Sequence, residues 1–177
     1  MKRKGLNRRR SGTWVVITAA MMTSAAFMPL PPSLYMPYLS PLKKGVVVSG
    51  FGVRMHPVLQ ESRMHNGVDF RAKEGTEVYA AGSGLILEAG ESGGNYGLMI
   101  DIHHDNSYVS RYAHLSKLAV KAGDVVAAGQ LIGYSGNTGL STGPHLHYEV
   151  IQDKEKVDPM IYLPEDVKVE EAGISVD

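Results

Sequence analysis

From residue 45 onward, short apolar runs alternate with turns that contain glycine. The runs are rich in valine, isoleucine, leucine and tyrosine, most of which favour strands, and no window keeps the 3.6-residue period of a helix. Short strands at regular spacing predict an all-β fold, with antiparallel sheets in a barrel-like or sandwich-like arrangement that leaves a groove. The expected strands lie at residues 46–48, 77–80, 85–87, 98–103, 108–115, 125–128 and 131–132.

Two features add detail to this sheet. Asp105-Asn106 separates two of the expected strands and predicts a hairpin. The pattern Lys-x-Gly-x-x-Val-x-Ala occurs at residues 73–80 and again 48 residues later, at residues 121–128. Such a repeat predicts that a turn-and-strand unit occurs twice, as in folds built from a duplicated β motif.

Residues 145–149 read His-Leu-His-Tyr-Glu and also have the character of a strand. Because side chains alternate between the two faces of a strand, His145, His147 and Glu149 share one face, and the residues between them point to the core. Two imidazoles and a carboxylate on one face predict part of a metal site. A solvated strand face is the alternative that this stretch leaves open.

The N-terminal segment has the layout of an export signal. Six basic residues fall in the first ten positions, and residues 14–28 form an uncharged, mostly apolar run. Small residues before and at Ala26 suit cleavage after that position, whereas an uncleaved anchor would attach the chain to the inner membrane through residues 14–28. The run is short for a full membrane span of about 20 residues. We expect an exported protein, with residues 1–28 as signal peptide or membrane anchor.

The rest of the chain divides by composition. Residues 29–44 contain five prolines and predict an extended linker. Residues 45–163 form the expected domain. Residues 164–177 carry five acidic residues against one lysine and predict an acidic tail.

Charge and composition exclude several function classes. Without the basic N-terminal cluster, 12 basic residues stand against 18 acidic ones, a net charge of −6, which argues against a nucleic-acid partner. The absence of cysteine excludes disulfides, thiolate metal ligands and a cysteine nucleophile. Neither a Gly-x-Ser-x-Gly elbow nor a His-Glu-x-x-His helix motif occurs.

Two further stretches offer metal ligands. His65 and Asp69 lie four residues apart, around Gly67. The glycine and the following Phe70 favour a strand, on which residues 65, 67 and 69 share a face, although a helix would also bring the two side chains together. His114 lies at the end of an expected strand. His103, His104 and His56 are expected not to bind metal.

A catalytic zinc site has three nitrogen or oxygen ligands and one open position. His65, Asp69 and one of His145 and His147 would provide that set. The remaining histidines would then stand near the water and perform acid–base chemistry, for which the pKa of histidine is suited.

Three segments occur in a fixed order: His65-x-x-x-Asp69, then Tyr112-x-His114-Leu115, then Gly143-Pro144-His145-Leu146-His147. This ordered motif resembles the lysostaphin/LytM-type zinc metallopeptidase family. The resemblance covers residues 45–163 and extends to matches at residues 50–57, 75–80, 129–133 and 135–139.

The resemblance implies one zinc ion held by His65, Asp69 and His147, with His114 and His145 as the catalytic histidines. It does not say which of the two is the base. For Arg54 the expectation is an ion pair with Asp69 or with a substrate carboxylate. For Glu149 it is a role in orienting a metal ligand, with a solvated surface acid as the alternative. The glycine-rich segments 90–97 and 135–143 are expected to form groove walls.

The family implies a zinc-dependent endopeptidase that hydrolyses peptide bonds in bacterial peptidoglycan, and hence a location in the periplasm or cell envelope. Both a glycine bridge and a cross-link between D-amino acids remain open as the bond cleaved. The alternative is a non-catalytic LytM-like domain that binds and activates another cell-wall hydrolase.

Overall fold

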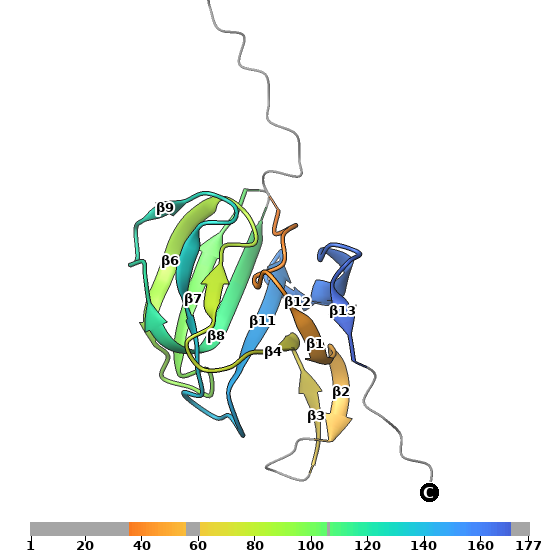
Figure 1. Cartoon of the computed structure of the whole chain (residues 1–177). Coiled ribbons are helices and arrows are strands. Elements are labelled where there is room, and N and C mark those ends of the chain that lie inside the picture. The colour runs from red at the N-terminus through yellow and green to blue at the C-terminus, as the bar shows by residue number, and fades with distance from the viewer. Residues whose placement is uncertain (1–35, 56–60, 106, 171–177) are drawn as a thin grey trace, which may run out of the picture.

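The computed structural model describes residues 36–55, 61–105 and 107–170. In these residues the chain forms thirteen strands and one short 3-10 helix, η2 (Pro159–Ile161), which confirms the all-β prediction (Figure 1). The expected signal or anchor at residues 1–28, residues 29–35 of the proline-rich segment, His56 and residues 171–177 lie outside the described residues. The described part of that segment packs against the domain, since Leu42 is buried in the core and the Pro41 carbonyl accepts the Tyr79 amide at 2.9 Å.

The strands follow the apolar runs of the sequence. Their bounds in chain order are β1 (Val46–Ser49), β2 (Gly52–Met55), β3 (Ser62–His65), β4 (Val68–Arg71), β5 (Glu77–Tyr79), β6 (Gly84–Glu91), β7 (Leu98–His103), β8 (Tyr108–Leu118), β9 (Val125–Val126), β10 (Leu131–Ser135), β11 (His145–Gln152), β12 (Glu155–Val157) and β13 (Lys168–Val169).

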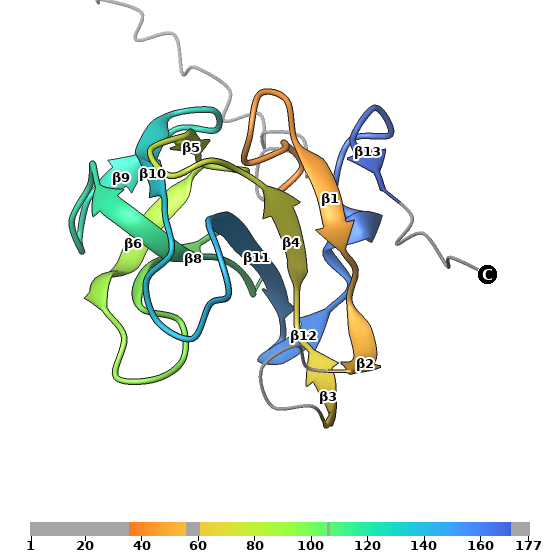
Figure 2. The same ribbon diagram turned by 60° about the horizontal axis from the view of Figure 1, so that its bottom comes forward.

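Eleven of these strands form one sheet, whose main path is β13-β1-β4-β11-β8-β7-β6-β9. Strand β10 pairs with β5 and β8, and β12 pairs with β11. All pairs in this sheet are antiparallel except β1–β13, so the expected antiparallel arrangement is confirmed. Strands β2 and β3 form a separate antiparallel pair that extends beyond the ends of β1 and β4 (Figure 2).

Strands β4, β8 and β11 position the site. Strand β11 lies between the other two, and the register pairs His147 with Asp69 of β4 on one side and with Ala113 of β8 on the other. One face of these strands packs into the core with fully buried side chains, each worth about 1.5–3 kcal/mol of burial. These side chains are Val68, Phe70, Tyr112, Leu146, Tyr148 and Val150.

The repeated sequence pattern forms the same turn twice. The carbonyl of Lys73 accepts a hydrogen bond from the Thr76 amide, and the carbonyl of Lys121 accepts one from the Asp124 amide, both at 3.1 Å. The glycine of each copy has a positive φ, +81° and +90°, which glycine adopts at lower cost than a residue with a side chain. Strands β5 and β9 follow these turns, so the predicted turn-and-strand unit occurs twice.

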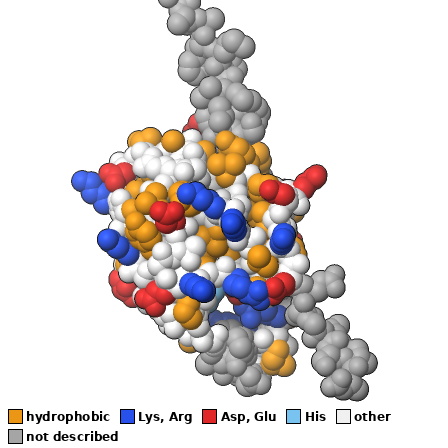
Figure 3. Space-filling view, viewed as in Figure 1, with side chains coloured by type: hydrophobic (Ala, Val, Ile, Leu, Met, Phe, Trp, Pro, Cys, Tyr) orange, Lys and Arg blue, Asp and Glu red, His pale blue; other side chains and the backbone are white. Residues whose placement is uncertain are grey.

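The C-terminal segment begins as part of the sheet. Strand β13 pairs with β1, and Glu170 forms an ion pair with Arg71 of β4. The acidic composition of residues 164–177 did not predict this pairing. The described residues include no helix that is long and apolar enough to cross a membrane. On the face in Figure 3, acidic and basic side chains of the described residues are interspersed.

Candidate metal centre

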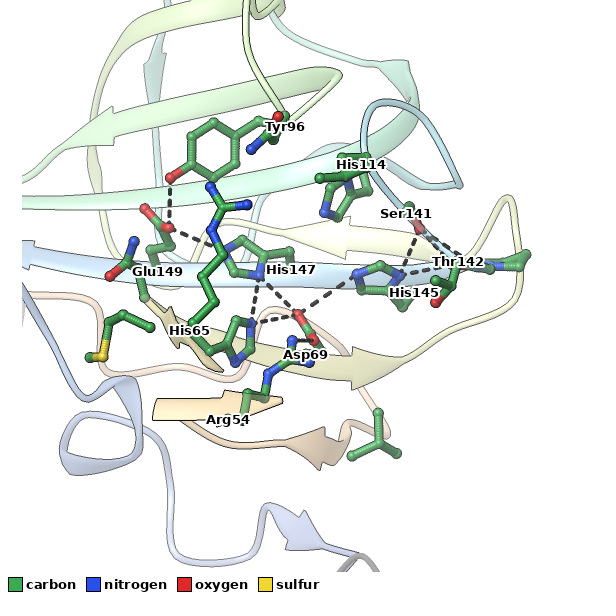
Figure 4. A pocket seen from close by; sticks show the side chains of 18 residues that line it. Arg54, His65, Asp69, Tyr96, His114, Ser141, Thr142, His145, His147 and Glu149 are labelled. Carbon is green, nitrogen blue, oxygen red and sulfur yellow. Dashed lines mark hydrogen bonds and ion pairs between the residues drawn. The ribbon is translucent and has the colours of Figure 1, made fainter. Parts of the chain in front are cut away.

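An open groove of about 450 Å³ runs over the polar face of β4, β8 and β11. The β2–β3 hairpin lines one side through Arg54, Arg63 and Met64, and residues 140–144 line the other. Asn95 and Tyr96 also contribute, so both glycine-rich segments supply groove walls as expected. Figure 4 shows the histidines and acids gathered on the floor of this groove.

Strand β11 has the predicted alternation. His145, His147 and Glu149 line the groove, whereas Leu146 and Tyr148 are fully buried on the core side. The reason is the two-residue period of an extended strand, which the sequence contains without interruption from residue 145 to residue 150.

The expectation that His65 and Asp69 share one strand is wrong. His65 ends β3 and Asp69 lies in β4, with a break at residues 66–67. Gly67 is needed at this break because a Cβ there would lie 2.3 Å from the carbonyl oxygen of Tyr148. The two side chains still meet, because the chain changes direction between the hairpin and the sheet.

Three potential ligand atoms converge at the floor of the groove. Nε2 of His65 lies 3.1 Å from Oδ1 of Asp69 and 3.2 Å from Nδ1 of His147. Nδ1 of His147 lies 2.8 Å from the same Oδ1. In the part of the chain that the structure describes, this is the group of histidine and acidic residues able to hold a metal ion.

The outer contacts of these ligands favour a cation between them. Nδ1 of His65 lies 2.6 Å from the carbonyl oxygen of Gly50, and Nε2 of His147 lies 3.1 Å from Oε1 of Glu149. If each of these nitrogens donates its hydrogen outward, both neutral rings present lone pairs to the carboxylate of Asp69. Three converging acceptors repel one another unless a proton or a metal ion lies between them. The residues therefore fit a metal ion.

Electrostatic interactions keep the carboxylate of Asp69 ionised. Burial raises the pKa of Asp69, but hydrogen bonds with His147 and His65 outweigh it and hold the pKa well below its ordinary value. Burial lowers the pKa of His147, but its hydrogen bonds with Asp69 and Glu149 raise it above the ordinary value. A positive charge at the centre of this cluster is thus favoured.

The two other histidines stand beside the cluster. Nδ1 of His114 lies 2.7 Å from the carbonyl oxygen of Thr138, and Nδ1 of His145 lies 2.8 Å from that of Gly143. The ring centroids are 4.7 Å apart, and Nε2 of His145 lies 3.7 Å from Oδ1 of Asp69. His114 has a φ of +60°, a left-handed conformation that is unusual for a residue with a side chain.

Of the two ion pairs expected for Arg54, the structure contains the one with Asp69. Its guanidinium donates a hydrogen bond of 3.1 Å to Oδ2 of Asp69, the oxygen that does not face the histidines. For Glu149, the expected alternative of a solvated acid is wrong. Its side chain is buried, and it accepts hydrogen bonds from His147 and from two residues that sequence reasoning missed, Tyr96 and Lys156.

Lys156 and a third missed residue, Arg111, reach the site through strand pairing. Lys156 lies in β12, opposite β11, so a β11–β12 hairpin places it beside Glu149. Arg111 of β8 pairs directly with Glu149 of β11 in the register. The turn-forming sequence Asp153-Lys154 could have indicated the hairpin, whereas Tyr96 comes from a loop and left no pattern in the sequence.

The histidines expected not to bind metal lie elsewhere. His104 is fully buried, and its ring contacts the Ser83 carbonyl at 2.7 Å and the Ser110 hydroxyl at 2.8 Å. His103 is exposed at the end of β7. Neither residue lines the groove.

Similar proteins share the domain. One relative, named DD-carboxypeptidase/endopeptidase Mpg, from Neisseria meningitidis serogroup B, is 43% identical over 127 residues, which cover 71% of this chain and 29% of the relative. Peptidoglycan DD-endopeptidase ShyA of Vibrio cholerae serotype O1 is 48% identical over 109 residues, covering 60% and 25% of the two chains. The chain thus matches less than a third of the length of these relatives.

Solved structures have the same fold. A zinc containing peptidase from Vibrio cholerae superposes with a TM-score of 0.64 at 37% identity, covering 76% of this chain and 40% of that one. The catalytic domain of lysostaphin from Staphylococcus simulans gives a TM-score of 0.58 at 42% identity, covering 64% and 87%. The family model of Peptidase family M23 matches residues 63–159, which contain all five histidine and aspartate residues of the ordered motif. The resemblance is confirmed, and the chain belongs to Peptidase family M23.

Proposed function

We propose that this chain is a zinc-dependent endopeptidase that hydrolyses peptide bonds in bacterial peptidoglycan. The observation that carries the proposal is the convergence of three ligand atoms, from His65, Asp69 and His147, on the floor of an open groove with two more histidines beside them. Three protein ligands leave a position free for water, as catalytic zinc sites require.

The three ligands would hold the ion, and their outer partners fix their orientation. Gly50 and Glu149 bind the far nitrogens of the two histidines, and Arg54 binds the outer oxygen of Asp69. When bound, zinc supplies Lewis-acid chemistry, which acidifies water and polarises the scissile carbonyl.

We assign the proton-accepting role to His114. Burial lowers the pKa of His114 to about 4, so the ring is neutral at physiological pH. A proton on Nδ1 is donated to the Thr138 carbonyl, which leaves the lone pair on Nε2 to accept the proton of the attacking water.

His145 is then the candidate donor. Its Nδ1 contacts the Gly143 carbonyl and lies 3.2 Å from the Ser141 hydroxyl, and its Nε2 is directed toward the ligand cluster. In its charged form, this Nε2–H can donate a hydrogen bond to the developing oxyanion and pass a proton to the leaving amine.

The names of the relatives narrow the substrate. Mpg is named as a DD-carboxypeptidase/endopeptidase and ShyA as a peptidoglycan DD-endopeptidase, and we propose that this chain also cleaves a cross-link between D-amino acids. The groove is open enough for an extended peptide to lie across β11. Such a substrate lies outside the cytoplasmic membrane, and we propose that residues 1–28 direct the chain there as a signal or anchor, ahead of the proline-rich residues 29–44.

The direct test is a digest of purified peptidoglycan by the chain, with and without a zinc chelator, with mass spectrometry of the released fragments. The proposal predicts products that disappear with the chelator, and the fragment masses identify the bond. A folded, zinc-loaded protein that releases nothing would contradict the catalytic role. It would favour a non-catalytic domain that binds and activates another hydrolase.

The catalytic assignment has its own test. A His145→Ala protein should retain zinc at one ion per chain but lose hydrolysis by about 10²–10⁴-fold, since general acid–base groups contribute that range. The matched control is His103→Ala, which removes an exposed histidine away from the groove. A His145→Ala protein that still digests cell-wall material would overturn the assignment.

A further inference from the structure

Behind the proposed metal ligands lies a buried cluster of charged and polar side chains. Glu149 is at its centre and has no exposed surface. Its Oε1 lies 3.1 Å from Nε2 of His147, 2.9 Å from the Tyr96 hydroxyl and 3.0 Å from Nζ of Lys156. Figure 4 shows the contacts of the Tyr96 phenol and the His147 imidazole meeting at the same carboxylate oxygen of Glu149.

Tyr96 and Lys156 also bind each other. Nζ of Lys156 donates to the Tyr96 hydroxyl at 2.6 Å, and that hydroxyl donates its own hydrogen to Glu149. The lysine therefore contacts Glu149 both directly and through the phenol. Neither residue belongs to the ordered histidine and aspartate motif.

The second carboxylate oxygen faces another cation. Nη1 of Arg111 lies 3.6 Å from Oε2 of Glu149, and the same guanidinium makes two hydrogen bonds to Asp101, of 2.8 and 2.7 Å. The guanidinium carbon also lies 4.6 Å from the centre of the Tyr96 ring. Arg111 is thus fixed by its neighbours and closes the far side of the carboxylate.

Tyr96 reaches the other half of the site through its backbone. Its carbonyl oxygen accepts the backbone N–H of His114 at 2.9 Å, at the point where that residue has a positive φ. One residue therefore contacts, through its hydroxyl and its carbonyl, both the partner of His147 and the backbone of His114.

We infer that Tyr96 and Lys156 are positioning residues, which hold Oε1 of Glu149 against the Nε2–H of His147 and so leave Nδ1 of His147 as the atom that binds the metal. The inference rests on the proposed metal site and deepens it. Without the two donors, the carboxylate is free to turn away, and the imidazole loses the contact that selects its orientation. The expected consequence is weaker metal binding by a ligand set that is itself unchanged.

The test measures the zinc affinity of the full chain by competition with a chromogenic chelator at fixed pH. Glu149→Gln should weaken zinc binding by about 10–100-fold, the range for a group that orients a metal ligand. Lys156→Met and Tyr96→Phe should each weaken it by about 3–10-fold, because each removes one of the donors that hold Glu149. Lys121→Met is the matched control and should bind zinc as the original chain does.

A double substitution separates positioning from a general structural effect. Because Lys156 acts through Glu149, adding Lys156→Met to Glu149→Gln should weaken zinc binding no further. Thermal unfolding of the chelator-treated proteins checks that the single variants fold. Lys156 is partly exposed, so its replacement tests the inference even if the buried Glu149→Gln protein fails to fold.

Three results would overturn the inference. The first is a zinc affinity of both Lys156→Met and Tyr96→Phe within twofold of the Lys121→Met control. The second is a loss of zinc affinity caused by Lys156→Met that is equally large in the original chain and in the Glu149→Gln protein. The third is a loss of affinity in Lys156→Met that is matched by unfolding of the metal-free protein. Because zinc binding is measured without peptidoglycan, a chain that binds zinc in this pattern but hydrolyses nothing would contradict the proposed function alone.

Discussion

The two faces of β11 are buried to nearly the same degree, but they are stabilised in different ways. On the core face, Leu146, Tyr148 and Val150 have no exposed surface. On the groove face, Glu149 is equally buried and His147 retains 6% of its surface. One strand therefore presents an apolar core and a charged site on its opposite sides.

The difference shows what burial requires of each kind of side chain. Apolar groups gain free energy from removal from water and need only close packing. A buried charge needs a partner for each of its charged atoms, or the protein loses several kcal/mol. The groove face meets most of this requirement with ligand-to-ligand contacts and with donors from β12 and a loop, whereas Oε2 of Glu149 has only the ion pair with Arg111 of β8 at 3.6 Å and no hydrogen bond. Its stability therefore depends on distant parts of the chain.

Removing a ligand from the groove face should have the largest effect. His147→Ala takes away one of the three proposed metal ligands, and we expect loss of bound zinc and a fall in hydrolysis of about 10²–10⁴-fold, the equivalent of several kcal/mol of lost Lewis-acid stabilisation. Metal analysis of the purified protein and the peptidoglycan digest measure the two effects. Full zinc content in this variant would show that another residue serves as the ligand.

Removing a side chain from the core face should change stability instead. Leu146→Ala leaves a cavity among fully buried residues and should lower the free energy of unfolding of the metal-free protein by about 2–5 kcal/mol. Urea unfolding measures this loss. At a temperature where the variant is folded, its zinc content should equal that of the original chain; a loss of zinc without a loss of stability would break the distinction between the two faces.

The groove side should also be the more sensitive to pH, through His114 on β8. Burial lowers its pKa from an ordinary value of 6.5 to about 4 in the folded state. The unfolded chain therefore binds more protons between pH 6.5 and pH 4, and this residue destabilises the metal-free protein as the pH falls through that window, by up to about 3 kcal/mol.

Urea unfolding of the metal-free chain and of His114→Gln at pH 7 and pH 4.5 tests this expectation. Burial also lowers the pKa of His104, but that residue is present in both proteins, so the difference between them isolates His114. Equal losses of stability in the two proteins would show that His114 is not the group responsible.

The smallest effect is expected at the one polar atom of the core face. Among the described residues, the hydroxyl of Tyr148 is buried with no hydrogen-bond partner. Tyr148→Phe removes an unsatisfied polar group and should be neutral or should stabilise the protein by about 1 kcal/mol. Thermal unfolding provides the measurement, and a clear loss of stability would reveal a partner for the hydroxyl.

The sequence was informative where the pattern is local. The alternation in β11 and the repeated turns follow from short-range rules, because a strand has a period of two and a positive φ selects glycine. The ordered motif identified the family, and all five of its histidine and aspartate residues lie in or beside the groove.

Contacts between strands were harder to predict. His65 and Asp69 lie on different strands. The break between these strands falls at Gly67, which packs against the backbone of β11. Lys156 and Arg111 reach Glu149 only because of the strand register, which no local pattern specifies. The partners of a buried charge are set by tertiary structure, so the sequence indicated Glu149 but not the residues that hold it.

The backbone of His114 has a consequence for how this protein tolerates change. A residue with a side chain at a φ of +60° costs about 1–2 kcal/mol relative to a relaxed conformation, and glycine or asparagine would occupy that position more favourably. Directed evolution for thermal resistance alone should therefore replace His114 early, and the selected variants would be more stable but would lack the proposed proton acceptor. A screen that combines heat challenge with cell-wall hydrolysis would keep the histidine and find stabilising substitutions at other positions. Selection for stability and selection for activity therefore favour different residues at position 114.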